Sequence, residues 1–256
     1  MSGQGGSSAW TTQAAATGQQ GGRVHGSDIN LRARAQLAEY VTAADRIAAA
    51  GHARVLDWGC GYGLMTRLLT DRGLEVTAID YDPAEPEPRV RPLERFPGLA
   101  ALRTSEPVQL PFEDESFEAV LSMGVLEHVP NPDGSLDELH RVLRPGGTLY
   151  CYKLPNRWSY LEFIARRSGR MYFHGQLPDD RLYTPAEARA LFERHNLAVA
   201  QARRANMLPL TLTADWVNRV APVIWPLNRA LSRVPVLNML ATNVEVTARR
   251  SSRSAS

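Results

Sequence analysis

The chain has 256 residues, enough for one domain with insertions, and 44% of them are hydrophobic, which can supply a sizeable core. The formal net charge is only +2 at pH 7 and the basic residues form no long run, which argues against a nucleic-acid-binding protein. Cys60 and Cys151 have neither metal-ligand spacing nor a disulfide framework, so we expect a protein of the cytoplasm that holds no metal.

Both ends of the chain are poor in periodic apolar residues. Residues 1–27 consist mainly of Gly, Ser, Gln, Thr and Ala, and we expect a disordered tail there and a second one over 251–256. The ordered domain is expected over 28–250. No apolar run reaches the roughly 18 residues of a membrane span, and the N-terminal segment lacks the apolar core of a secretory signal.

The most informative stretch, residues 55–64, reads Val-Leu-Asp-Trp-Gly-Cys-Gly-Tyr-Gly-Leu. Two apolar residues, glycines at alternate positions and then apolar residues at helical spacing predict a strand, a tight turn and a helix. Glycines let the backbone turn sharply and approach a ligand without a Cβ in the way. A second strand, 75–80, ends in Asp80 about twenty residues beyond the glycines, where α/β nucleotide-binding folds place an acid on the ribose hydroxyls.

The pattern formed by Asp57, Gly59, Gly61 and Gly63 resembles motif I of the class I S-adenosylmethionine-dependent methyltransferases. The dinucleotide fingerprint of NAD enzymes instead requires Gly or Ala where this chain has Leu64. The resemblance implies a Rossmann-like, doubly wound α/β sheet of seven strands, mostly parallel with an antiparallel seventh, and helical insertions that cover the active site. It also implies S-adenosylmethionine as the cofactor, with S-adenosylhomocysteine as the product.

Further segments between 55 and 155 resemble the small-molecule branch (type 11) related to ubiquinone- and biotin-pathway methyltransferases. In residues 106–112, Glu-Pro-Val-Gln-Leu-Pro-Phe, the family's acid accepts a hydrogen bond from the adenine amino group. The stretch 123–129, Met-Gly-Val-Leu-Glu-His-Val, follows the fourth strand, where an open parallel sheet places its ligand. The cofactor-binding residues that the resemblance implies are Asp57, Gly59, Cys60, Gly61, Gly63, Asp80, Tyr81, Glu106, Val108, Met123 and Gly124.

The other expected elements follow from periodicity and from helix breakers. Prolines crowd residues 83–92, so the usual crossover helix after the second strand should be short or missing. Strands are expected over 99–103, 117–122, 149–153, 197–202 and 243–248. Thr184, Pro185 and Glu187 predict the first turn of a helix that continues to residue 193.

Methyl transfer from a sulfonium needs mainly positioning, and a base is required only for a weak acceptor such as a hydroxyl. His128 is the first candidate base because it lies just past the fourth strand; the alternative is a histidine that caps or packs the next helix. His174 is the second candidate. Glu127, Lys153 and Tyr183 are weaker ones.

Two apolar insertions, 156–183 and 206–240, predict a lid over the substrate. Pro209, Pro222 and Pro226 predict short helices rather than one continuous helix in the second insertion. The side chains expected to contact the acceptor are Tyr160, Tyr183, Trp216 and Trp225.

Two other uses of the second insertion stay open. It can serve as a homodimer interface, and the arginines beside its aromatic residues also fit attachment to a membrane surface. The expected function is transfer of a methyl group, by in-line displacement, to a small-molecule acceptor such as an oxygen of a secondary-metabolite intermediate. The alternatives are a non-catalytic S-adenosylmethionine-binding protein and an NAD-dependent oxidoreductase on a similar sheet.

Overall fold

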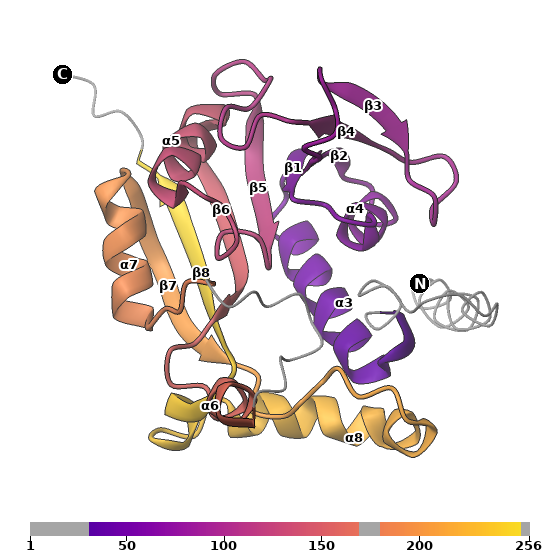
Figure 1. Cartoon of the computed structure of the whole chain (residues 1–256), viewed down its shortest axis with the longest axis vertical. Coiled ribbons are helices and arrows are strands. Elements are labelled where there is room, and N and C mark those ends of the chain that lie inside the picture. The colour runs from indigo at the N-terminus through magenta and orange to yellow at the C-terminus, as the bar shows by residue number, and fades with distance from the viewer. Residues whose placement is uncertain (1–30, 169–179, 252–256) are drawn as a thin grey trace.

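The computed structural model describes residues 31–168 and 180–251, so the predicted tail 1–27 and residues 252–256 lie outside it. The described strands form one sheet in the order β3-β4-β2-β1-β5-β6-β8-β7 (Figure 1). These strands are β1 (Arg54–Trp58), β2 (Glu75–Tyr81), β3 (Arg89–Pro92), β4 (Ala100–Thr104), β5 (Phe117–Met123), β6 (Leu143–Pro155), β7 (Leu197–Ala205) and β8 (Asn243–Arg250).

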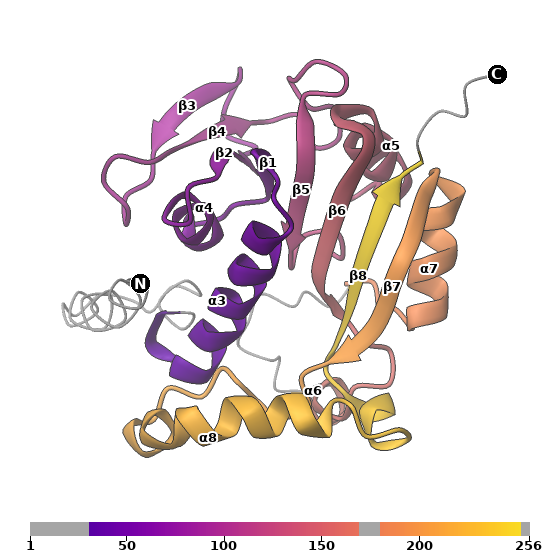
Figure 2. The same cartoon turned by 180° about the vertical axis from the view of Figure 1, so that it is seen from behind.

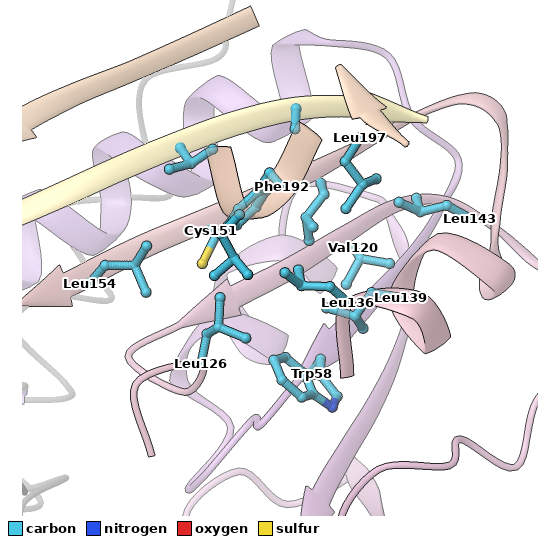
Figure 3. Packing of buried hydrophobic residues seen from close by; sticks show 14 of the residues in the cluster. Trp58, Val120, Leu126, Leu136, Leu139, Leu143, Cys151, Leu154, Phe192 and Leu197 are labelled. Carbon is cyan, nitrogen blue, oxygen red and sulfur yellow. The ribbon is translucent and has the colours of Figure 1, made fainter. Parts of the chain in front are cut away.

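Helices α3 (Arg34–Ala49) and α4 (Leu64–Thr70) pack on one face of this sheet, and α5 (Pro132–Val142) and α7 (Pro185–Arg194) pack on the other. The helices α6 (Tyr160–Ser168) and α8 (Asp215–Leu231) lie at one end of the molecule, and α8 is followed by the 3-10 helix η2 (Leu237–Leu240). Alternate strand residues point to opposite faces, so Leu121 packs with α3 and α4 whereas Val120 packs with α5 and α7. Figure 3 shows the second of these cores, with Leu136, Leu139 and Phe192 close to the sheet.

The strand order confirms the predicted α/β fold. β1 lies parallel between β2 and β5, and the chain therefore leaves β1 and β5 toward opposite halves of the sheet. In open α/β sheets ligands bind at this switch point, outside the carboxyl ends of the strands. The last strand, β8, runs antiparallel between β6 and β7, as predicted.

The sheet has eight strands, not the predicted seven. The additional strand is β3, which pairs antiparallel with β4 at one edge of the sheet. The proline-rich segment cannot form a crossover helix, and the described residues 82–99 contain none, in agreement with the prediction. An edge strand tolerates Pro92 because a missing N–H is harmless on a side that has no neighbour.

The expectation of short helices in the second insertion is wrong, because α8 is a continuous helix of 17 residues that contains Pro222 and Pro226. Both prolines are exposed, whereas Val217, Ala221 and Asn228 are buried on the other side of the helix. Each proline removes one backbone hydrogen bond, and packing of the opposite side against α3 offsets that loss. Figure 2 shows α8 lying across one end of the molecule beside α3.

Asn228 fixes the segment between β7 and α8. Its Oδ1 accepts hydrogen bonds from the backbone N–H groups of Met207 and Leu208, at 2.8 and 2.9 Å, and its Nδ2 donates to Asn206 Oδ1 at 3.0 Å. Asn206 in turn donates to Glu39 Oε1 of α3. The residues that follow Asn206 are thereby held against α3. None of the described helices is long and apolar enough to cross a membrane.

We predict that Asn228→Ala lowers the free energy of unfolding by about 2–5 kcal/mol, because it leaves buried N–H groups without an acceptor. Urea denaturation measures the loss. Asn218→Ala is the matched control: Asn218 also bonds backbone groups, but it lies at a half-exposed position on the same helix. Equal losses in the two variants would contradict the anchoring role of Asn228.

Candidate functional site

A cavity of about 410 Å³ opens at the carboxyl ends of β1, β5 and β6. A neighbouring cavity of about 310 Å³ lies beside the ends of β2 and β4. Gly59, Gly124 and His128 line both cavities, so the two meet between the loop after β1 and the loop after β5. The larger one, called the main cavity below, is also lined by residues of α3 and by residues 208–211.

The glycines at positions 59, 61 and 63 have different structural roles. Gly59 has a φ of +73°, and a Cβ there would lie 2.4 Å from a methyl carbon of Val125. Gly63, at the start of α4, would meet Leu93 in the same way and does not line either cavity. A Cβ on Gly61 would meet nothing within 4 Å, and this residue lines the main cavity. Gly61 is therefore the position where a ligand can approach the backbone.

Asp57 and Cys60 are buried at the main cavity. Asp57 Oδ2 accepts a hydrogen bond from Thr66 Oγ1 of α4 at 2.6 Å, which ties the end of β1 to the helix after the loop. Burial raises the pKa of Asp57 to about 6. Burial also raises the pKa of the Cys60 thiol, which therefore stays uncharged at neutral pH.

Asp80 lines the smaller cavity together with Tyr81 and Glu106. Its Oδ2 pairs with Arg103 Nη1 at 2.6 Å, and Arg103 also donates to the carbonyl oxygen of Gly61 at 3.1 Å. Sequence reasoning missed Arg103. The signal available was its position in β4, directly opposite Asp80 in the parallel register.

Glu106 and Val108 belong to the loop after β4. Glu106 Oε1 accepts a hydrogen bond from the Val108 backbone N–H at 3.3 Å. Val108 lines neither cavity and lies beside Gly134 of α5, so its part is to shape the loop that carries Glu106. Met123 and Gly124 line the main cavity, and Gly124 also lines the smaller one.

His128 faces both cavities and is held by a buried carboxylate. Its Nδ1 lies 2.7 Å from Asp180 Oδ1, and its Nε2 lies 3.8 Å from Glu127 Oε1. The Asp180 side chain is 3% exposed. No spacing in the sequence links Asp180 to His128, since they are 52 residues apart. The other candidate base, His174, lies outside the described residues.

A second group of charges lies on the wall of the main cavity. Lys153 Nζ is 3.2 Å from Glu39 Oε2 and 4.6 Å from the centre of the Tyr40 ring. The attraction of Glu39 and Tyr40 for the ammonium group raises the pKa of Lys153 in spite of its burial, so the side chain is a cation at neutral pH. Glu39 and Tyr40 come from α3.

The four side chains expected to contact an acceptor lie elsewhere. Tyr160 donates its hydroxyl to the Met207 carbonyl, and Tyr183 is buried in the core between the sheet and α7. Trp216 is 68% exposed, and Trp225 packs on a small cluster between α3 and α8. None of them lines the main cavity in the described part of the chain; the loop before α8 does.

Glu127 is 5% exposed, and in the described part of the chain its Oε2 has no hydrogen-bond partner. Burial raises its pKa from 4.5 to about 8. The folded protein therefore holds this proton in a range where the unfolded chain releases it. The stability that the folded protein gains from the protonated Glu127 is fully present below pH 4.5 and is lost as the pH rises to about 8.

We predict that Glu127→Gln, which cannot titrate, gains stability relative to the wild type between pH 5 and 8, by up to about 1.4 kcal/mol for each pH unit. Urea denaturation at a series of pH values measures the difference. Glu113→Gln, at an exposed carboxylate, should follow the wild type. Parallel pH profiles for Glu127→Gln and the wild type would show that Glu127 is not held protonated.

Comparison with known proteins supports the resemblance of residues 57–63 to the methyltransferase motif I. Residues 56–151 match the family model described as a methyltransferase domain. A ubiquinone biosynthesis O-methyltransferase of Xanthomonas oryzae pv. oryzae is 39% identical over an alignment of 122 residues, which covers 45% of this chain and 48% of that protein. The chain thus spans about half the length of the curated relatives it matches.

Solved structures agree over most of the fold. An S-adenosylmethionine-dependent methyltransferase of Thermotoga maritima aligns with a TM-score of 0.56 at 16% identity, covering 87% of this chain and 93% of the other. A second, from Archaeoglobus fulgidus, aligns with a TM-score of 0.54 at 17% identity, covering 82% and 94%. Residues 56–151 are therefore similar to a methyltransferase domain, and the chain has the fold of S-adenosylmethionine-dependent methyltransferases.

Proposed function

We propose that this protein transfers the methyl group of S-adenosylmethionine to an oxygen atom of a small-molecule acceptor. The observation that carries the proposal is the pair of cavities that meet at Gly59, Gly124 and His128, with Gly61 open on one side and the Asp80 carboxylate on the other. The named O-methyltransferase among the relatives favours oxygen as the acceptor atom. A secondary-metabolite intermediate is the acceptor we favour.

The residues present fit the cofactor. Asp80 would accept hydrogen bonds from the ribose hydroxyls, and Glu106 would accept one from the adenine amino group, because both carboxylates line the smaller cavity. The amino-acid tail would pass Gly61, where the backbone has no side chain in the way. S-adenosylmethionine, when bound, supplies the electrophilic methyl group. The chain's own task is to hold the acceptor in line with it in the main cavity and to exclude water.

His128 would remove the proton from an acceptor hydroxyl. The Asp180 carboxylate accepts a hydrogen bond from Nδ1–H, which leaves Nε2 with its lone pair free to take a proton at the junction of the two cavities. The same carboxylate stabilises the imidazolium that forms. A protein that only binds the cofactor would need neither the His128–Asp180 pair nor a cavity for an acceptor beside it.

We propose that the domain runs over 28–250 and that the protein works in the cytoplasm, where it can form a homodimer.

We predict that Asp80→Ala weakens binding of S-adenosylhomocysteine about ten- to a hundredfold, because a charge-assisted hydrogen bond contributes about 1.5–3 kcal/mol. Calorimetric titration measures the affinity. Asp71→Ala is the matched control, since Asp71 also pairs with an arginine, Arg67 of α4, and lines neither cavity. An unchanged affinity of Asp80→Ala for S-adenosylhomocysteine would contradict the assignment of Asp80 to the ribose hydroxyls.

We predict that His128→Ala lowers kcat for a hydroxyl acceptor by about 10²–10⁴ while binding of S-adenosylhomocysteine is kept, because only the proton transfer is lost. Initial rates on a panel of hydroxylated aromatic compounds, from pH 6 to 9, measure the effect. His195→Ala is the control, because His195 also bonds aspartates, at 2.6 and 2.9 Å, and lines neither cavity. A kcat for His128→Ala equal to that of the wild type would exclude His128 as the base.

A further inference from the structure

Lys153 is the only lysine in the sequence, in which lysine and arginine together number 29. Its side chain lines the main cavity. Arginine presents a planar fork of donors, whereas lysine presents a compact point charge on a flexible stem. The wall of the main cavity therefore carries a compact ammonium group in a chain that otherwise uses guanidinium groups.

A break in β6 turns Lys153 toward the cavity. The register between β6 and β8 shifts between Cys151 and Leu154. These two residues pack in the core with α5 and α7, whereas Tyr152 packs in the core with α3 and α4. In a regular strand Leu154 would share the face of Tyr152, so Lys153 is the additional residue of a bulge. Its φ of +66° is an unfavourable backbone conformation of the kind that proteins keep at functional sites.

The bulge brings the ammonium group to α3. Nζ lies 3.2 Å from Glu39 Oε2 and 4.6 Å from the centre of the Tyr40 ring. Asn206 donates to the other oxygen of Glu39, so the carboxylate is held in place. An ammonium group has three N–H donors, and in the described part of the chain a carboxylate oxygen and a ring face account for two of them. The Lys153 side chain is 17% exposed, and one donor is left for a ligand in the cavity.

Lys153 and His128 flank the same short stretch of the cavity wall. A Cβ on Gly124 would lie 3.9 Å from Lys153 Cβ and 3.7 Å from Glu127 Oε1. The same Glu127 oxygen lies 3.8 Å from His128 Nε2. Gly124 and His128 line both cavities, so Lys153 stands beside the place where the cofactor and the acceptor would meet.

A base alone is a weak means of activating a phenol. A phenolic hydroxyl has a pKa of about 10 and an imidazolium one of about 6.5, so the proton transfer is unfavourable by about three pH units. An opposite charge within about 4–6 Å of an acidic group lowers its pKa by about 1–3 units. A fixed cation near the acceptor oxygen would therefore offset much of this difference.

We propose that Lys153 is a further catalytic residue, whose ammonium group donates a hydrogen bond to the acceptor oxygen and stabilises the negative charge that forms there. The proton of the hydroxyl goes to His128 Nε2. The new bond joins the acceptor oxygen to the methyl carbon, and the electron pair of the broken carbon–sulfur bond stays on sulfur. Lys153 keeps its proton throughout. This inference rests on the proposed function.

The first test needs no turnover. It follows the absorbance of para-nitrophenol bound to the complex of the protein with S-adenosylhomocysteine, and a titration gives the pKa of the bound phenol. Lys153→Met should raise this pKa by about 1–3 units, because the cation is lost. Glu39→Gln keeps the ammonium group and removes the neighbouring anion, so it should lower the pKa or leave it unchanged. A Lys153 that merely holds α3 through Glu39 would make the two variants behave alike, which would overturn the inference.

The second test is kinetic. On a panel of ring-substituted phenols, Lys153→Met should lower kcat by about 10², with the largest loss on the least acidic phenols, while the affinity for S-adenosylhomocysteine is kept. The double variant Glu39→Gln/Lys153→Met leaves no unpaired carboxylate at this place and should show the same loss, which separates the effect from misfolding. Arg203→Met is the matched control, because Arg203 also pairs with a glutamate, Glu245, and lines neither cavity.

The two proposals fail in different ways. Methylation of the phenols by the wild type with an equal kcat for Lys153→Met would overturn the role of Lys153 and leave the proposed function standing. A wild type that methylates none of the phenols would contradict the proposed function for this class of acceptor, and the role of Lys153 with it.

Discussion

The site depends on the close approach of two loops. Gly59, in the loop after β1, lies so near Val125, in the loop after β5, that a Cβ would overlap the valine methyl groups. The two loops lie at the point where the chain leaves β1 and β5 toward opposite halves of the sheet. It also places Gly124 and His128 at the junction of the two cavities. A larger residue at position 59 would separate the cofactor end of the site from the acceptor end.

Charge is distributed unevenly between the two cavities. The smaller one has the carboxylates of Asp80 and Glu106 at its edge, suited to hydroxyl and amino donors of a nucleoside. The main cavity holds the Lys153–Glu39 pair, and burial keeps Glu127 largely protonated near neutral pH. Asp57, Arg95 and Glu162 line the main cavity as well, so acidic and basic side chains both face an acceptor there.

Sequence predicted what local patterns encode. The stretch from Asp57 to Gly63 predicted a strand, a turn and a helix, because turn geometry and helix periodicity are short-range properties. The cofactor and the fold were implied by the resemblance of this stretch to motif I. Asp180 and Glu39 could not be predicted, since only the folded chain brings them to His128 and Lys153. The prediction that the prolines break α8 was wrong, because packing of the helix against α3 outweighs the backbone hydrogen bonds that the prolines remove.

The most direct measurement is a crystal structure of the protein with S-adenosylhomocysteine. Our account predicts the ribose hydroxyls within hydrogen-bond distance of Asp80, the adenine beside Glu106 and the sulfur atom where the two cavities meet, next to Gly124 and His128. An adenosine bound in the main cavity, or no bound ligand at a saturating concentration, would contradict it.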